Sequence, residues 1–206
     1  MEFLGTFTLV FIGAGAAAAG HGGIIGAALA HGLVVLNTIY LFGSISGAHI
    51  NPAVSFAFLL SGRATWQITI TYWISQLLGG TAAAGLLLIV FGGNQNGLGA
   101  TVLAPQVSVF QGLLVEISLT FVMVNIIFQA AVRERAGDLA GIVIGLTLVA
   151  LILLGGPLTG ASLNPARTLG PAIFTGSLDL FWLYLLGPLT GAALAAGLNQ
   201  LLPDSR

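Results

Sequence analysis

The sequence has no cysteine, no lysine and very little charge of either sign, which excludes several classes of protein. Five basic and six acidic residues make up 5% of the 206-residue chain, whereas 57% of the residues are hydrophobic. A soluble domain carries charge on roughly a quarter of its residues, so a water-soluble globule is excluded. A chain without cysteine forms no disulfide framework and offers no thiolate. The net charge of −1 argues against a nucleic-acid partner, which requires a basic surface.

What the chain does contain is long apolar sequence, which predicts a polytopic protein of the lipid bilayer. About 20 consecutive apolar residues span the hydrocarbon core. Six segments are long enough, at residues 3–20, 24–43, 65–91, 109–132, 139–155 and 180–201. Two shorter pieces, 51–60 and 164–174, would cover only about half of that thickness as helices. We therefore expect an all-α membrane protein with six transmembrane helices and two re-entrant half-helices.

The arginines orient this arrangement in the membrane. With six spans, the arginines outside the apolar segments fall on one side: Arg63, Arg133, Arg135 and Arg206. The positive-inside rule makes that side cytoplasmic, so we expect both termini there, in the cell (plasma) membrane. No basic run precedes the first apolar segment, which argues against a cleavable signal peptide.

The chain also contains an internal repeat. Residues 46–53, Ser-Gly-Ala-His-Ile-Asn-Pro-Ala, match residues 159–166, Thr-Gly-Ala-Ser-Leu-Asn-Pro-Ala, 113 positions later. Each repeat, at about 1–91 and 109–206, holds three spans and one half-span. Because three is an odd number, the second repeat is inverted, and the two half-helices are predicted to meet near the midplane. We expect one transmembrane channel domain over residues 1–206.

Both half-helices are predicted to begin at an Asn-Pro-Ala box. Asn is a good N-cap and Pro is favoured at the first helical position, which gives the starts Asn51-Pro52-Ala53 and Asn164-Pro165-Ala166. Two helix N-termini that face each other, each with roughly half a positive charge, would repel cations. The asparagine NH2 groups would donate hydrogen bonds to a small neutral molecule, and oriented water would conduct protons poorly. A single Asn-Pro is usually a turn, but two copies in inverted repeats favour a pore.

Two carboxylates occupy equivalent positions in the repeats. Glu2 and Glu116 lie 114 positions apart within apolar segments. We expect each to accept N–H hydrogen bonds from the non-helical chain that leads into its half-helix. The alternative is a proton relay, which requires more than two isolated carboxylates. His49, two residues before Asn51, is expected to fix the first loop in place.

These motifs resemble the aquaporin (major intrinsic protein) family over essentially the whole chain. The resemblance is carried by the two boxes, Ser46-Gly47-Ala48, Arg167 after the second box, Glu2-Phe3-Leu4-Gly5-Thr6 and Gly187-Pro188. It implies six tilted helices, two half-helices and a homotetramer with one pore in each subunit.

Members of that family have a second, extracellular constriction formed by four positions. Counted from the two asparagines, the resemblance puts them at His31, Ile152, Ala161 and Arg167. Strict water channels usually have an aromatic residue at the first position and His at the second, so this set instead resembles plant tonoplast intrinsic proteins. Arg167 would be a donor to solutes and a barrier to cations; a structural ion pair is the alternative. His31 would line the pore, the alternative being a histidine packed in the core.

The resemblance implies a passive channel for water and other small neutral solutes, such as ammonia or hydrogen peroxide, that excludes protons and ions. A glycerol, small-polyol or ammonia facilitator is the alternative, although Thr168 and Ala172 differ from the residues typical of glycerol facilitators. An ion-coupled secondary transporter would require carboxylates near the boxes, and none is there. The sequence contains no catalytic constellation and no metal-ligand spacing, so we expect no enzyme activity, metal or cofactor. The conformation of the 92–108 loop stays open.

Overall fold

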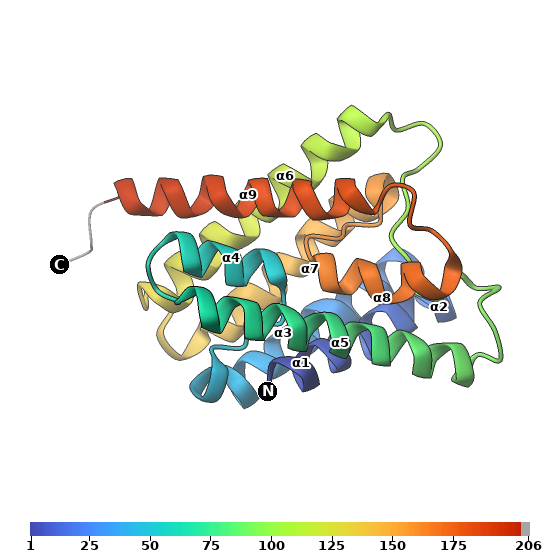
Figure 1. Ribbon diagram of the computed structural model, residues 1–206, viewed down its shortest axis with the longest axis horizontal. Helices are drawn as coiled ribbons and strands as arrows, with labels where there is room; N and C mark the ends of the chain where they lie inside the picture. Colours follow the sequence, from blue (N-terminus) through green and yellow to red (C-terminus); the bar gives the residue numbers. More distant parts are fainter. Residues whose placement is uncertain (203–206) are drawn as a thin grey trace.

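The computed structural model describes residues 1–202, and within them every regular element is a helix. Six segments are long and apolar enough to cross a membrane: Glu2–Ala19, Gly23–Ser46, Trp66–Val90, Val109–Val132, Gly137–Thr159 and Phe181–Leu201. They run along the length of the molecule, and two shorter helices, α4 (Pro52–Leu60) and α8 (Pro165–Thr175), lie among them (Figure 1). The predicted fold class of six spans and two half-helices is confirmed.

Three of the six spans are single helices: α3 (Gly23–Ser46), α5 (Trp66–Val90) and α9 (Phe181–Leu201). The others combine shorter elements. The first span consists of α1 (Glu2–Thr8), the π-helix η1 (Leu9–Ala14) and α2 (Gly15–Ala19). The fourth span consists of α6 (Val109–Ile127) and the π-helix η3 (Phe128–Val132). The fifth span consists of the 3-10 turn η4 (Gly137–Leu139) and α7 (Ala140–Thr159). The π-helical turns were not predicted, because hydropathy reports the length of a span and not its local helical pitch.

The fifth span extends past its predicted end at residue 155. Helix α7 continues through Pro157 to Thr159 and ends at Gly160, whose φ of 79° is left-handed. Proline removes one backbone donor, and this loss is tolerated within the last turn of a membrane helix packed among other helices. The extension brings the end of α7 to the start of the second re-entrant loop.

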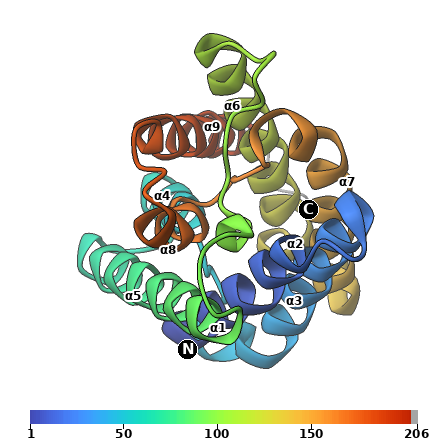
Figure 2. The same ribbon diagram turned by 90° about the vertical axis from the view of Figure 1, so that its right-hand side faces the viewer.

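The helices surround α4 and α8 unevenly. Seen end-on, α5 and α9 flank the two half-helices on one side of the molecule, and α3 and α7 lie on the other side (Figure 2). Helices α3 and α7 cross backbone to backbone, since a Cβ on Gly32 would lie 2.5 Å from the Gly145 carbonyl oxygen. Small residues permit such close crossings in membranes. The crossing places His31 of α3 near Ile152 of α7.

Two of the arginines outside the half-helices lie together at one end of the molecule. Arg63 and Arg133 line the same cavity as Gln200, near the end of α9. Arg206, which was used to orient the chain, lies outside the described residues. Large apolar side chains such as Ile89 (76% exposed) face outward along the spans, as expected for helices surrounded by lipid.

Candidate pore and its two constrictions

The N-termini of the two half-helices meet through their asparagines. Asn51 caps α4 by accepting a hydrogen bond from the backbone N–H of Ala53 at 2.8 Å. Asn164 caps α8 by accepting from the N–H groups of Ala166 (3.0 Å) and Arg167 (3.2 Å). An Asn-Pro sequence favours this geometry because the Asn oxygen satisfies an orphan donor and Pro lacks one.

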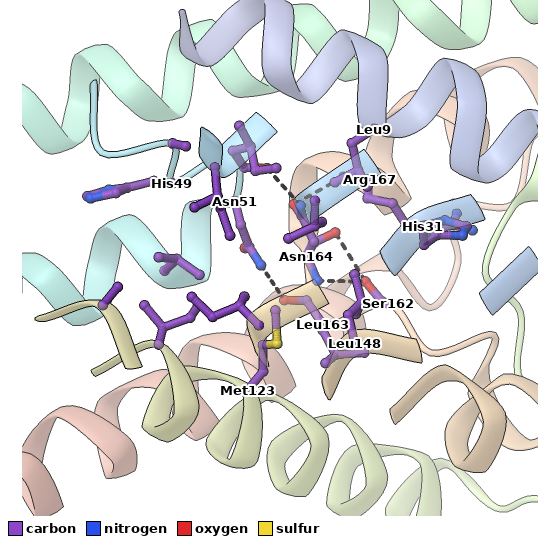
Figure 3. Close-up of a pocket in the computed structure, with 18 of the residues that line it drawn as sticks. Leu9, His31, His49, Asn51, Met123, Leu148, Ser162, Leu163, Asn164 and Arg167 are labelled. Carbon is purple, nitrogen blue, oxygen red and sulfur yellow. Dashed lines mark hydrogen bonds between the residues drawn. The ribbon is translucent and has the colours of Figure 1, made fainter. Parts of the chain in front are cut away.

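The amide groups of the same asparagines bind the opposite loop. Asn51 Nδ2 donates to the Leu163 carbonyl oxygen at 2.8 Å, and Asn164 Nδ2 donates to the Ile50 carbonyl oxygen at 2.9 Å (Figure 3). Each amide NH2 group has two protons, and each asparagine uses one of them in its hydrogen bond to the opposite loop. The pair therefore locks the two half-helices end to end and leaves a second N–H on each asparagine for a molecule in the lumen.

The loops that lead into the half-helices have an unusual backbone. Ala48 and Ile50 in the first loop, and Ala161 and Leu163 in the second, have φ values between 44° and 52°. Non-glycine residues adopt this left-handed region at a cost of order 1–3 kcal/mol each, and only where the surroundings enforce it. The same alternation occurs in both loops, so the same constraint acts in both.

That constraint is a buried carboxylate behind each loop. Glu2 accepts hydrogen bonds from the backbone N–H groups of His49 (3.0 Å) and Ile50 (2.6 Å). Glu116 accepts from the N–H groups of Ser162 (2.9 Å) and Leu163 (2.8 Å). The carboxylates thereby satisfy donors that no helix can satisfy, which backbone at membrane depth requires.

Two cavities follow one another along the axis of the half-helices. The inner cavity, of about 100 Å³, is lined by both asparagines and by all four predicted constriction residues, His31, Ile152, Ala161 and Arg167. The outer cavity, of about 430 Å³, opens beside the 92–108 loop. His31, Ile152 and Arg167 line both cavities, so they lie at the junction. We call these three residues and Ala161 the neck.

Arg167 is buried in the neck, on the first turn of α8. Its Nη1 donates a 2.6 Å hydrogen bond to the carbonyl oxygen of Gly99, in the 3-10 turn η2 (Gly97–Gly99). The contribution of Gly99 was missed from the sequence, because the contact joins positions 68 residues apart. Gly97 and Gly99 both have positive φ, so a glycine-rich loop was the only local signal.

His31 faces Arg167 across the junction with a defined tautomer. Its Nδ1 lies 2.8 Å from the Ala27 carbonyl oxygen, one turn back along α3. Since a carbonyl only accepts, Nδ1 carries the proton, and Nε2 of the neutral ring is an acceptor. Nε2 is buried and has no hydrogen-bond partner among the described residues. The neck thus combines a guanidinium that only donates, the imidazole of His31 and the apolar side chains of Ile152 and Ala161.

His49 lies on the opposite side of the asparagine pair from His31 (Figure 3). It lines the inner cavity, its Nδ1 lies 3.1 Å from Ser55 Oγ, and its ring centroid is 4.3 Å from that of Phe58. Of the remaining predicted site residues, those within the half-helices are buried behind the asparagines and do not line the cavity: Pro52, Ala53, Pro165 and Ala166. Glu2 and Glu116 also lie outside the lumen, behind the loops.

Comparisons with known proteins agree with this architecture. The sequence model of the major intrinsic protein family matches residues 1–198. Aquaporin NIP1-1 of Zea mays is 42% identical over 201 residues, covering 95% of this chain and 71% of that protein. Aquaporin TIP1-2 of Zea mays is 39% identical over 208 residues, covering 95% and 81%. The X-ray structure of the aquaglyceroporin from Plasmodium falciparum superposes with a TM-score of 0.88 at 26% identity, covering 98% of this chain and 93% of the other. This chain therefore belongs to the major intrinsic protein family and is a passive membrane channel for water and small solutes, not an enzyme.

Proposed function

We propose that this channel conducts water together with small neutral solutes that both donate and accept hydrogen bonds, such as ammonia and hydrogen peroxide. The observation that carries the proposal is that Arg167, a hydrogen-bond donor, and His31, whose buried Nε2 has no partner among the described residues, both lie at the junction of the two cavities. A solute that bonds to both walls recovers part of its lost hydration. Ile152 and Ala161 offer no such bonds, so the neck is apolar on its other sides.

Cations and protons are excluded at two places in this proposal. Arg167 is a fixed positive charge in the neck, and the N-termini of α4 and α8 present their positive dipole ends at the asparagine pair. Water that accepts bonds from Asn51 and Asn164 on the same side is oriented, which interrupts a proton-conducting chain. Glu2, Glu116 and His49 support the loops rather than move protons, since the two carboxylates already accept several hydrogen bonds each.

A polyol facilitator is the second candidate, because the superposed solved structure is an aquaglyceroporin. In this chain, only the Ile152 and Ala161 sides of the neck offer an apolar surface for a polyol's carbon chain, which favours smaller solutes.

We propose one channel domain of two inverted repeats over residues 1–206, assembled as a homotetramer with a pore in each subunit. Both termini are assigned to the cytoplasmic side, since Arg63 and Arg133 lie together at that end. The plasma membrane is our proposed location, and the TIP relatives make the vacuolar membrane the alternative. Light scattering of the purified protein tests the tetramer, and fractionation of native membranes tests the location.

Stopped-flow measurements on proteoliposomes test the transport proposal. Water, ammonia, hydrogen peroxide and glycerol permeabilities are compared with those of empty vesicles of the same lipid. We expect fast water, ammonia and peroxide flux with a low activation energy, and little glycerol flux. Fast glycerol flux with slow water flux would contradict the assignment of the neck. In the variant His31→Phe, ammonia flux should fall more than water flux. An equal loss of both fluxes would contradict the assignment of His31 to the neck.

A further inference from the structure

The ring of His31 rests on a bare stretch of helix backbone. A Cβ placed on Gly13, within the π-helical turn η1, would lie 2.6 Å from His31 Cδ2 and 2.8 Å from both Cγ and Nε2. Three consecutive ring atoms at nearly equal distances mean that the face of the imidazole, rather than its edge, covers Gly13. No side chain larger than hydrogen fits at this position while the ring stays where it is.

Other contacts also fix the position of the His31 ring. The Nδ1 hydrogen bond to the Ala27 carbonyl oxygen fixes one edge against α3, and the residue is only 4% exposed. His31 also lines both the inner and the outer cavity, so part of its surface faces the lumen. A group added at Gly13 would therefore displace the imidazole toward the neck.

We propose that Gly13 is a specificity-determining residue of this channel, although it lines neither cavity. By leaving room for the His31 ring, it sets how far the imidazole projects into the neck. This inference rests on the proposed role of His31 as a wall of the neck. It adds a fifth position, on the first span, to the four residues that define the constriction.

The test is the variant Gly13→Ala, assayed in proteoliposomes for water, hydrogen peroxide and ammonia. We expect water permeability per folded channel to fall several-fold, with a larger fall for hydrogen peroxide, because the larger solute is more sensitive to a narrower neck. Two matched substitutions serve as controls. Gly15→Ala on the same span would meet only Leu87, outside the lumen, and Gly197→Ala would meet nothing within 4 Å. Both should leave the ratio of peroxide to water permeability unchanged.

A double variant tests whether the effect passes through the ring. With His31→Ala the ring is absent, so adding Gly13→Ala should change neither the permeabilities nor the solute ratio. An equal loss in both backgrounds would overturn the proposal, as would a Gly13→Ala channel indistinguishable from the unmodified one. If Gly13→Ala alone does not fold, recovery of a folded channel in the double variant supports the ring contact, and failure of the double variant as well overturns it.

The single variant His31→Ala separates this inference from the proposed function. If it leaves every permeability unchanged, His31 does not form the neck and both proposals fail. If it alters the solute ratio while Gly13→Ala does not, only the role of Gly13 is lost.

Discussion

The two re-entrant segments, residues 46–60 and 159–175, share one backbone design and differ in their side-chain chemistry. In each, an asparagine caps the half-helix, two non-glycine residues with left-handed backbone precede it and a carboxylate binds the loop. A tyrosine anchors the end of the preceding helix in both: Tyr72 donates to the Ser46 carbonyl oxygen at 2.7 Å, and Tyr184 to that of Thr159 at 2.9 Å.

Around the shared asparagines, several equivalent positions of the two segments carry different side chains. The first segment has His49 paired with Ser55 and packed on Phe58. The second has Ser162 bonded to Thr168, which in turn bonds to Thr101 at 2.7 Å. The position of Arg167 in the second segment corresponds to Val54 in the first, and both line the inner cavity. The comparison teaches that the scaffold is duplicated, whereas the buried arginine, with its charge, belongs to one segment only.

Removal of the carboxylates should have the largest effect and should affect both segments alike. Glu2→Ala and Glu116→Ala each leave two loop N–H groups and further polar groups buried without an acceptor, at about 1–3 kcal/mol each. We expect a loss of several kcal/mol in stability and little folded channel, measured by thermal unfolding in detergent. Glu116→Gln keeps one acceptor oxygen and should be intermediate, and the exposed Asp179→Ala is the control. A stable, active Glu116→Ala channel would contradict this account of the loops.

Replacement of Arg167 by the residue at the equivalent position of the first segment should weaken the proposed barrier to cations. Arg167→Val places the first-segment residue in the second segment and removes a fixed charge, which at about 4 Å and an effective dielectric constant of about 20 interacts by about 4 kcal/mol with a cation. Proton and sodium leak should therefore rise by more than about tenfold, as followed by a pH-sensitive dye and by sodium flux. The control Val54→Ala should not leak. If the Arg167→Val channel excludes cations as well as the unmodified channel does, the barrier to cations lies at the asparagine pair and not at Arg167.

The two asparagine caps should contribute nearly equally to the stability of the folded channel. Asn51→Ala and Asn164→Ala each remove a cap, worth about 0.5–2 kcal/mol, and a hydrogen bond to the opposite loop. Similar decreases in unfolding temperature are expected for the two variants, and the double variant should lose less than their sum, because both act on the same contact. Strictly additive losses would show that the half-helices are stabilised independently.

The tyrosines should show the smallest effect, and it should be unequal. Tyr184 is buried, so Tyr184→Phe leaves the Thr159 carbonyl oxygen without this donor away from water, at about 1 kcal/mol. Tyr72 is half-buried, and water can replace its hydroxyl, so Tyr72→Phe should cost less. Denaturation of both variants in the same detergent checks the order, and a larger effect at Tyr72 would reverse it.

Much of this architecture was predictable from local sequence. Hydropathy located the six spans to within a few residues, and the shortness of the apolar pieces around Asn51 and Asn164 identified the half-helices. Each helix start follows from a cap and a proline next to it in the chain. The extension of α7 through Pro157 was not predicted, because the preference of proline against helix interiors is local and packing overrides it.

The sequence by itself determined the membrane class, the spans, the match between residues 46–53 and 159–166 and the Asn-Pro-Ala starts, because apolar length, capping and self-similarity all act along the chain. Only the tertiary structure decided three sets of contacts. Asn51 and Asn164 each donate a hydrogen bond to the opposite loop, Arg167 donates one to the Gly99 carbonyl oxygen, and the ring of His31 packs against Gly13. These contacts join residues far apart in the chain. Their geometry depends on how six spans pack together, which periodicity does not encode.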